Sequence, residues 1–194
     1  MRAWIEMISP DVADGKLAKL YEKARTPAGT VDNVMQAHSL RPHTLDGHVA
    51  LYRAVLHHPD NTLPDWFLEA VGSYTSILNG CDYSLTHHRH NARALLGGGE
   101  TGDAALAALD NREPEQVFEG KYLALLQYVE KLTLSPAAIA REDVEGLRAS
   151  GASDGEILET NQVCGYFNYV NRHLNGLGVS TEGDKIGYYD EPGS

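Results

Sequence analysis

Proline, glycine and asparagine interrupt the 194-residue chain at short intervals, and the segments between them have the spacing of amphipathic helices. Within these segments apolar residues recur three or four positions apart, as they do on the core-facing stripe of a helix. Runs that alternate apolar and polar residues, which would indicate strands, are missing from the sequence. The sequence therefore predicts an all-α fold.

The expected helices begin and end at local signals. One begins at Ser9-Pro10, and a connector spans residues 26–39. A second begins near Pro42 and stops at His57-His58-Pro59, because a residue before proline avoids helical geometry. A third takes Thr62 as its cap and ends at the strong stop Asn79-Gly80. Further helices are expected over 81–97, after Thr101, around 122–132, after Ser135-Pro136, and from the capping box Ser153/Glu156 to Asn175-Gly176.

The charge balance excludes two classes of partner. Asp and Glu number 27 against 16 Lys and Arg, which gives a formal net charge of −11. Nucleic acid and anionic membrane surfaces bind proteins that carry positive charge, so neither is an expected partner of this acidic chain. No apolar run approaches the roughly 20 residues that span a bilayer, and residues 1–9 lack the apolar stretch of a secretion signal. We therefore expect a soluble, cytoplasmic protein.

A chain of this length can bury a core without a metal or a disulfide, so a single domain over residues 1–179 is expected. Residues 180–194 are a polar tail. Its Tyr188-Tyr189 pair could dock on a neighbouring subunit, because tyrosine is common at interfaces. The two cysteines, Cys81 and Cys164, are expected to be free thiols.

Reactive side chains concentrate in the middle of the chain. Cys81, Ser84 and His88 follow the spacing i, i+3, i+7 and so share one stripe of a helix. On one continuous helix Glu69 would lie about 18 Å from Cys81. If the chain reverses at Asn79-Gly80, however, Glu69 and His88 face each other across two antiparallel helices. A carboxylate there favours the imidazolium, which can relay a proton to the thiol, and the helix N-terminus favours thiolate at Cys81.

This cluster resembles a known motif. The spacing is similar to the E-x11-C-x2-C-x3-H motif of alkylhydroperoxidase D (AhpD), in the carboxymuconolactone decarboxylase-like family. Eleven residues separate Glu69 from Cys81-Asp82-Tyr83-Ser84, and three more separate Ser84 from His88. Residues 132–133, 147–148, 151–154 and 167–172 resemble the C-terminal half of its peroxidase-related branch. The resemblance covers residues 10–179. It implies an AhpD-like helical bundle that assembles as a homo-oligomer (dimer, trimer or hexamer) and reduces hydroperoxides.

The resemblance assigns roles by position. Cys81 matches the first cysteine of the motif, Glu69 the relay glutamate and His88 the relay histidine. Ser84 replaces the second cysteine, which in the two-cysteine mechanism is expected to meet peroxide. Serine forms neither a sulfenic acid nor a disulfide with Cys81, so that full cycle cannot operate here. Tyr83 stands where AhpD has a histidine and the peroxidase-related branch often has tyrosine.

Three functions follow as alternatives. The first is a one-cysteine peroxidase-related enzyme: the Cys81 thiolate reacts with a small hydroperoxide, Glu69 and His88 relay the proton, and an external thiol restores the cysteine. The second is a non-redox lyase or hydrolase that acts on a small carboxylated or lactone substrate, with His88 and Glu69 as its acid–base pair. The third is a non-catalytic helical oligomer with a vestigial motif.

Plainer interpretations compete with each assignment. Glu69 and His88 could form only a structural ion pair. Ser84 could be a nucleophile activated by His88, although no oxyanion-hole signal accompanies it. Cys164 is expected to be a core thiol, and Tyr83 and His87 are expected to surround the site without reacting. Asn168, Asn171 and Arg172 line either a pocket or a contact between subunits.

The nine histidines raise the question of a metal. None of them forms an H-E-x-x-H or a cysteine–histidine zinc pattern, and His87 and His90 lack a third ligand on their helix. The glycine run over 97–102 has neither the Gly-Lys-Ser/Thr ending of a phosphate-binding loop nor a preceding strand. The sequence therefore predicts neither a metal nor a cofactor.

Overall fold

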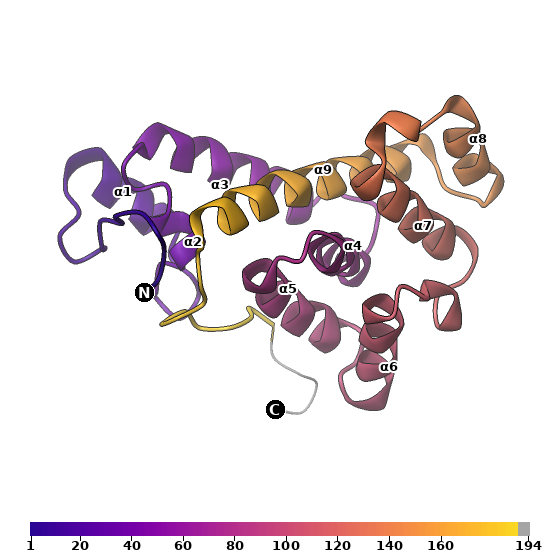
Figure 1. Cartoon of the computed structure of the whole chain (residues 1–194), viewed down its shortest axis with the longest axis horizontal. Helices are drawn as coiled ribbons and strands as arrows, with labels where there is room; N and C mark the ends of the chain where they lie inside the picture. The colour runs from indigo at the N-terminus through magenta and orange to yellow at the C-terminus, as the bar shows by residue number, and fades with distance from the viewer. Residues whose placement is uncertain (190–194) are drawn as a thin grey trace.

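Helix α4, Asp65–Leu78, lies at the centre of the molecule, and the other helices surround it (Figure 1). Ten consecutive residues of α4, numbered 67–76, are buried. A helix that is buried all round has to be covered on every side. The main neighbours of α4 are α5, α7 and α9. The structure is a computed structural model that describes residues 1–189.

Residues 1–189 contain helices, turns and irregular segments but no strand, which confirms the predicted all-α fold. None of the helices in this part of the chain is both long and apolar enough to cross a bilayer. Besides α4, the helices are α1 Gly15–Lys23, α2 Asn33–Gln36, α3 Pro42–Leu56, α5 Asp82–Leu95, α6 Gly99–Asp110, α7 Gly120–Leu134, α8 Arg141–Ala149 and α9 Asp154–Leu177, with short 3₁₀ turns at Pro114–Gln116 and Pro136–Ala138.

Several expected helix ends are confirmed. α3 stops before His57-His58-Pro59, and α5 follows the reversal at Asn79-Gly80. The capping box of α9 is present: the Ser153 hydroxyl accepts the amide of Glu156 at 3.2 Å, and the Glu156 carboxylate accepts the amide of Ser153 at 2.8 Å. These bonds satisfy amides that the first turn of a helix leaves without partners.

Three expected helix starts are wrong. Ser135-Pro136 begins only the 3₁₀ turn Pro136–Ala138, and α8 begins at Arg141. Ser9-Pro10 forms a turn, in which the amide of Val12 donates to the carbonyl of Ser9 at 3.2 Å, and α1 begins only at Gly15. Thr62 does not cap α4, because its amide and its hydroxyl both donate to the Glu159 carboxylate on α9. At Thr62, hydrogen bonds to another helix therefore use the groups that would have capped α4.

The expected end of α9 at Asn175-Gly176 is also wrong. The helix continues to Leu177 and closes on Gly178, whose φ of +59° is left-handed and suits glycine. The side-chain amide of Asn175 donates instead to the carbonyl of Asn79 at 3.2 Å. Asn175 thereby ties the end of α9 to the turn between α4 and α5.

Residues 180–189 run back from the end of α9 toward α5 and lie on their own chain (Figure 1). The Asn33 side-chain amide donates to the carbonyls of Ser180 and Glu182 at 2.9 and 3.0 Å. The Asp184 carboxylate accepts the backbone amide of Asn33 at 3.0 Å. These contacts hold the described part of the tail against α2, and docking of Tyr188-Tyr189 on a neighbouring subunit stays a prediction.

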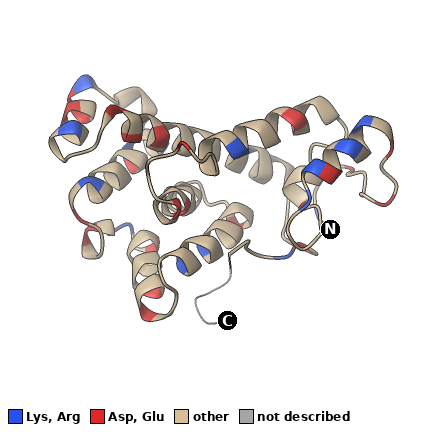
Figure 2. Cartoon of the chain, turned by 180° about the vertical axis from the view of Figure 1, so that it is seen from behind, with Lys and Arg blue, Asp and Glu red and all other residues tan. Residues whose placement is uncertain are grey.

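Acidic and basic residues are interspersed along the outer helices (Figure 2). Several of them pair across helices, as in Arg89–Asp110 at 2.6 Å and Lys131–Asp143 at 2.7 Å. Exposed pairs of this kind each stabilise a fold by roughly 0–1 kcal/mol, so the buried core around α4 has to supply most of the stability.

Three histidines lie together between α3 and α9, with the His38 ring stacked on that of His173 and tilted against that of His48. The rings of His38 and His173 lie 4.4 Å apart, and those of His38 and His48 lie 4.8 Å apart. Burial lowers the pKa of His38 to about 3, that of His48 to about 4, and that of His173 in the same direction. No group of His, Cys, Asp and Glu side chains within residues 1–189 is arranged to hold a metal ion. These rings therefore act as neutral core aromatics.

We expect the free energy of unfolding to fall as the pH drops below about 6.5. The unfolded chain protonates these histidines near their ordinary pKa of 6.5, whereas folded His38 and His48 stay neutral down to about 3 and 4. The contribution of these histidines to the free energy of unfolding is thus complete above pH 6.5. Below pH 6.5 it falls by about 1.4 kcal/mol per pH unit for each such histidine. Urea unfolding between about pH 7.5 and 5 measures this slope.

His48→Gln should flatten that slope, while His43→Gln, at an exposed position on the same helix, should keep it. A wild-type free energy of unfolding that stays constant across this pH range would contradict the prediction.

Candidate functional site

The helical hairpin α4–α5 builds the centre of the site. Gly80 turns the chain with a φ of +59°, and the amide of Cys81 donates to the carbonyl of Ser76 at 2.9 Å. The two helices then run antiparallel and bring the Glu69 carboxylate within 2.7 Å of Nδ1 of His88. The predicted meeting of Glu69 and His88 across the hairpin is confirmed.

The Glu69–His88 pair is held from several sides. Glu69 is only 2% exposed, and its second carboxylate oxygen accepts the side-chain amide of Asn91 at 3.3 Å. The Phe167 ring meets the His88 ring edge to face, with 4.6 Å between the ring centres. Because Nδ1 of His88 is engaged by Glu69, Nε2 is the nitrogen left to exchange a proton with a ligand.

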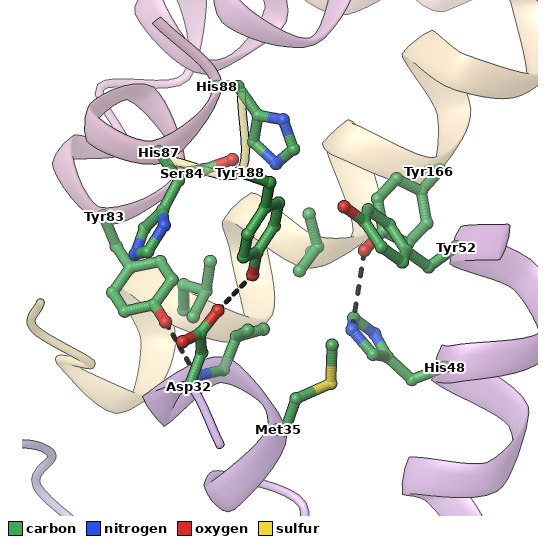
Figure 3. Close-up of a pocket in the computed structure, with 13 residues that line it drawn as sticks. Asp32, Met35, His48, Tyr52, Tyr83, Ser84, His87, His88, Tyr166 and Tyr188 are labelled. Carbon is green, nitrogen blue, oxygen red and sulfur yellow. Dashed lines mark hydrogen bonds between the residues drawn. The ribbon is translucent and has the colours of Figure 1, made fainter. Parts of the chain in front are cut away.

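His88 and Ser84 line a small cavity of about 30 Å³ (Figure 3). A space of this size holds about one or two water molecules. Tyrosines and histidines make up much of its wall, together with one carboxylate, so the ligand groups it suits are small and polar. The lining residues are Asp32, Val34, Met35, His48, Tyr52, Tyr83, Ser84, His87, His88, Tyr166, Val170, Leu174 and Tyr188.

A buried hydrogen-bonded chain orients Ser84. The Ser76 hydroxyl lies 3.0 Å from that of Ser84, 2.8 Å from the carbonyl of Gly72, and 3.0 Å from the Asn171 amide that donates to it. The Ser76 hydroxyl has only one proton to donate. If it donates that proton to the Gly72 carbonyl, the Ser84 hydroxyl has to be the donor in its hydrogen bond with Ser76. Asn171 therefore belongs to the site rather than to a contact between subunits.

Cys81 is the N-cap residue of α5 and is 1% exposed. Burial raises the pKa of its thiol, although the amides of Ser84 and Tyr83 and the Asn171 side chain act in the opposite direction. The expected effect of the helix N-terminus is thus present, but the loss of solvation outweighs it. The expectation of a favoured thiolate is wrong for this conformation, and Cys81 does not line the cavity.

Tyr83 and His87 lie on the wall of the cavity that faces the tail (Figure 3). The Tyr83 hydroxyl donates to the Asp184 carboxylate in a short hydrogen bond and accepts the backbone amide of Val34 at 3.0 Å. Nε2 of His87 is 3.6 Å from the same carboxylate. Both residues therefore line the cavity and connect it to the described part of the tail.

Asp32 and Tyr188 are site residues that the sequence analysis missed. The Tyr188 hydroxyl donates to one oxygen of the Asp32 carboxylate in a short hydrogen bond, and the other oxygen is buried without a partner. Burial, with repulsion from Asp184, raises the pKa of Asp32. These two residues are 156 positions apart, and no spacing rule connects them. The only signal in the sequence was the Tyr188-Tyr189 pair itself.

Cys164 is a core thiol, as predicted. It is buried, and its sulfur lies 3.3 Å from the Thr133 hydroxyl and 3.4 Å from the Asn168 side-chain amide. Arg172 donates to the side-chain oxygen of Asn168 at 2.8 Å. Asn168 and Arg172 therefore lie beside Cys164 and not at the cavity near His88.

The fold matches solved structures over almost its whole length. An uncharacterised peroxidase-related protein from Ralstonia eutropha JMP134, described as an alkylhydroperoxidase AhpD core, is 19% identical, with a TM-score of 0.81 and coverage of 93% of both chains. An uncharacterised peroxidase-related protein from Silicibacter sp. TM1040 is 23% identical, with a TM-score of 0.81 and coverage of 98% of this chain and 95% of that one.

A third structure, the debrominase Bmp8 without ligand, is 16% identical, with a TM-score of 0.70 and coverage of 94% of this chain and 92% of that one. No protein-family model matches the sequence, and no curated protein sequence matches it. These likenesses establish an AhpD-like helical fold, in which proteins of more than one described activity occur.

Proposed function

We propose that this chain reduces small hydroperoxides as a one-cysteine, thiol-dependent enzyme, with Cys81 as the reacting thiol. The observation that carries the proposal is the Glu69–His88 pair, 2.7 Å apart, on the wall of a cavity of about 30 Å³. That space suits the two oxygen atoms of a hydroperoxide group. The peroxidase-related proteins that share the fold support the same chemistry.

The proposed reaction balances with an external thiol as reductant. The Cys81 thiol first passes its proton to Nε2 of His88. The thiolate then attacks the terminal oxygen of the hydroperoxide, so that an S–O bond forms and the O–O bond breaks. Cys81 becomes a sulfenic acid, and the alkoxide takes a proton from Nε2 of His88 to give an alcohol. One external thiol then forms a disulfide with Cys81 and releases water, and a second thiol restores Cys81 and leaves as part of a disulfide.

Burial of Cys81 predicts a slow reaction at neutral pH that accelerates as the pH rises. The pKa of the thiol lies above its ordinary value of 9.0, so the thiolate fraction grows about tenfold per pH unit below it. We expect hydrogen peroxide to oxidise Cys81 of the folded protein increasingly between about pH 7 and 9. Trapping of the sulfenic acid with dimedone, followed by peptide mass spectrometry, measures this.

Cys164 is the internal control, because it is also buried and its pKa is also raised, yet it contacts Thr133 and Asn168, whereas Cys81 contacts the backbone of Ser84, a residue of the cavity wall. It should stay unmodified in the folded protein and react only in urea. Equal labelling of both cysteines, or no labelling of Cys81 at either pH, would contradict the proposal.

A second candidate is a non-redox lyase or hydrolase with His88 as its acid–base residue. The observation that favours it is that Ser84, and not Cys81, lines the cavity beside His88. The fold neighbour Bmp8, in a variant with one cysteine replaced by alanine, has been solved in complex with 2,3,4-tribromopyrrole, which is a small organic ring. For this chain such a function would leave Cys81 dispensable, whereas the first candidate requires it.

A further inference from the structure

A second pocket, of about 170 Å³, adjoins the cavity of Ser84 and His88. Met35, Tyr52 and Tyr188 line both spaces, so their side chains form the wall between them. The inner cavity of about 30 Å³ is too small for an organic molecule, whereas the outer pocket is of a size that admits one aromatic ring, as cavities of about 150 Å³ do. A ligand larger than a few atoms therefore has to place its body in the outer pocket.

Tyr188 is the part of this wall that does not belong to a helix. Met35 lies on α2 and Tyr52 on α3, whereas Tyr188 lies in the irregular segment that follows α9. Its hydroxyl is held by Asp32 and its backbone amide by Asn91, at 2.8 Å. Figure 3 shows its side chain between Asp32 and His88. The position of this side chain thus sets how far the outer pocket extends toward His88.

Two arginines, Arg25 and Arg53, are among the residues that line the outer pocket. Arg25 is already neutralised, because its guanidinium lies 2.6 Å from the Glu22 carboxylate. Arg53 donates to the backbone carbonyl of Lys23 at 2.6 Å, and no carboxylate within residues 1–189 forms an ion pair with it. A guanidinium has five N–H donors, so Arg53 keeps both its charge and further donors. Although the chain has a net charge of −11, the Arg53 guanidinium therefore attracts an anion locally.

We propose that the outer pocket binds a small organic monoanion. Its charged group pairs with Arg53, its flat apolar body lies along Val49 and Tyr52, and Tyr188 limits its length on the side of Ser84 and His88. This extends the proposed function by naming the class of molecule that reaches the site. The binding itself does not depend on the reaction at Cys81.

Titration calorimetry of the full chain with benzoate and with benzyl alcohol tests the anion site, since the two probes match in shape and differ in charge. We expect benzoate to bind more tightly, and Arg53→Met to weaken it by about tenfold while leaving benzyl alcohol unchanged. Arg41→Met is the matched control, because Arg41 is exposed, lies outside both pockets, and its guanidinium donates to the carbonyl of its neighbour Leu40. Equal affinity of the two probes, or of the Arg53 and Arg41 variants for benzoate, would overturn the proposal.

Tyr188 is tested with a longer anion, biphenyl-4-carboxylate. Tyr188→Ala joins the two spaces and should raise the affinity for this probe relative to benzoate by about tenfold. Tyr188→Phe keeps the ring and should leave the ratio at the wild-type value. An unchanged ratio in a folded Tyr188→Ala protein would show that Tyr188 is not the partition.

The experiments test the peroxidase function and the anion site independently. If benzoate binds as expected and Cys81 never reacts, the peroxidase function is wrong and the anion site stands. If Cys81 is oxidised specifically but the Arg53 variant binds benzoate like wild type, the anion site is wrong and the reaction stands.

Discussion

Replacing Cys81 by alanine is expected to reduce hydroperoxide consumption to the background rate of the thiol reductant alone. The sulfur of Cys81 is the only atom in the proposed reaction that changes its oxidation state on the protein, and alanine cannot replace it. Cys164→Ala should keep the wild-type rate, because that thiol is surrounded by Thr133 and Asn168 and lies away from the cavity. Peroxide consumption with dithiothreitol as reductant measures both variants.

His88→Gln separates the two candidate functions when it is measured beside Cys81→Ala. Loss of the proton-transfer residue should lower the rate by about 10²–10⁴-fold for either function. If His88→Gln abolished turnover of a carboxylated or lactone substrate while Cys81→Ala preserved it, the non-redox candidate would replace the peroxidase. A Cys81→Ala protein that consumed peroxide at the wild-type rate would exclude the first proposal.

Replacing Phe167 by alanine is expected to lower the free energy of unfolding by about 3–5 kcal/mol. Phe167 is 0% exposed, and its ring lies so close to α4 that a Cβ atom on Gly72 would be 2.4 Å away. The same ring also meets the imidazole of His88 edge to face. Its loss should therefore leave a cavity in the core and free the orientation of His88. Urea unfolding and the hydroperoxide assay measure the two effects.

Two controls make the Phe167 prediction specific. Tyr169→Ala, two positions along α9 and 46% exposed, should change stability by less than about 1 kcal/mol. Gly72→Ala should be strongly destabilising alone but less so together with Phe167→Ala, because the clash disappears with the ring. A loss below about 1 kcal/mol for Phe167→Ala, or additive effects of the pair, would contradict this account.

The sequence was sufficient for the all-α fold, for most of the helices and for the central pair of the site, although the short helix α2 falls in the expected connector over 26–39. Breaks such as Asn79-Gly80 act locally, and the helical hairpin that they define places Glu69 opposite His88 by geometry alone. The start of α4 was mistaken because the decisive hydrogen bonds are not local, whereas at Ser9-Pro10 the chain forms a local turn that does not continue as a helix. Glu159, on the last helix, takes the Thr62 groups that would otherwise cap α4.

The remaining wall of the cavity could not be predicted from the sequence. Asp32 lies in a connector, Tyr188 lies in the tail, and their contact depends on the whole fold being in place. The pKa of Cys81 was predicted with the wrong sign for a related reason. Helix position can be read locally, whereas burial is a property of everything that packs over the thiol, and here burial has the larger effect.

The contact between Asp32 and Tyr188 also has a consequence for the order in which the molecule takes shape. Glu69 and His88 are 19 residues apart and can meet as soon as one helical hairpin has formed, whereas Asp32 and Tyr188 are separated by 156 residues. Contacts at large sequence separation carry the greater entropic cost of loop closure and form late. During synthesis the acid–base pair can therefore assemble well before residue 188 has been made, and closing of the cavity is among the last steps of folding.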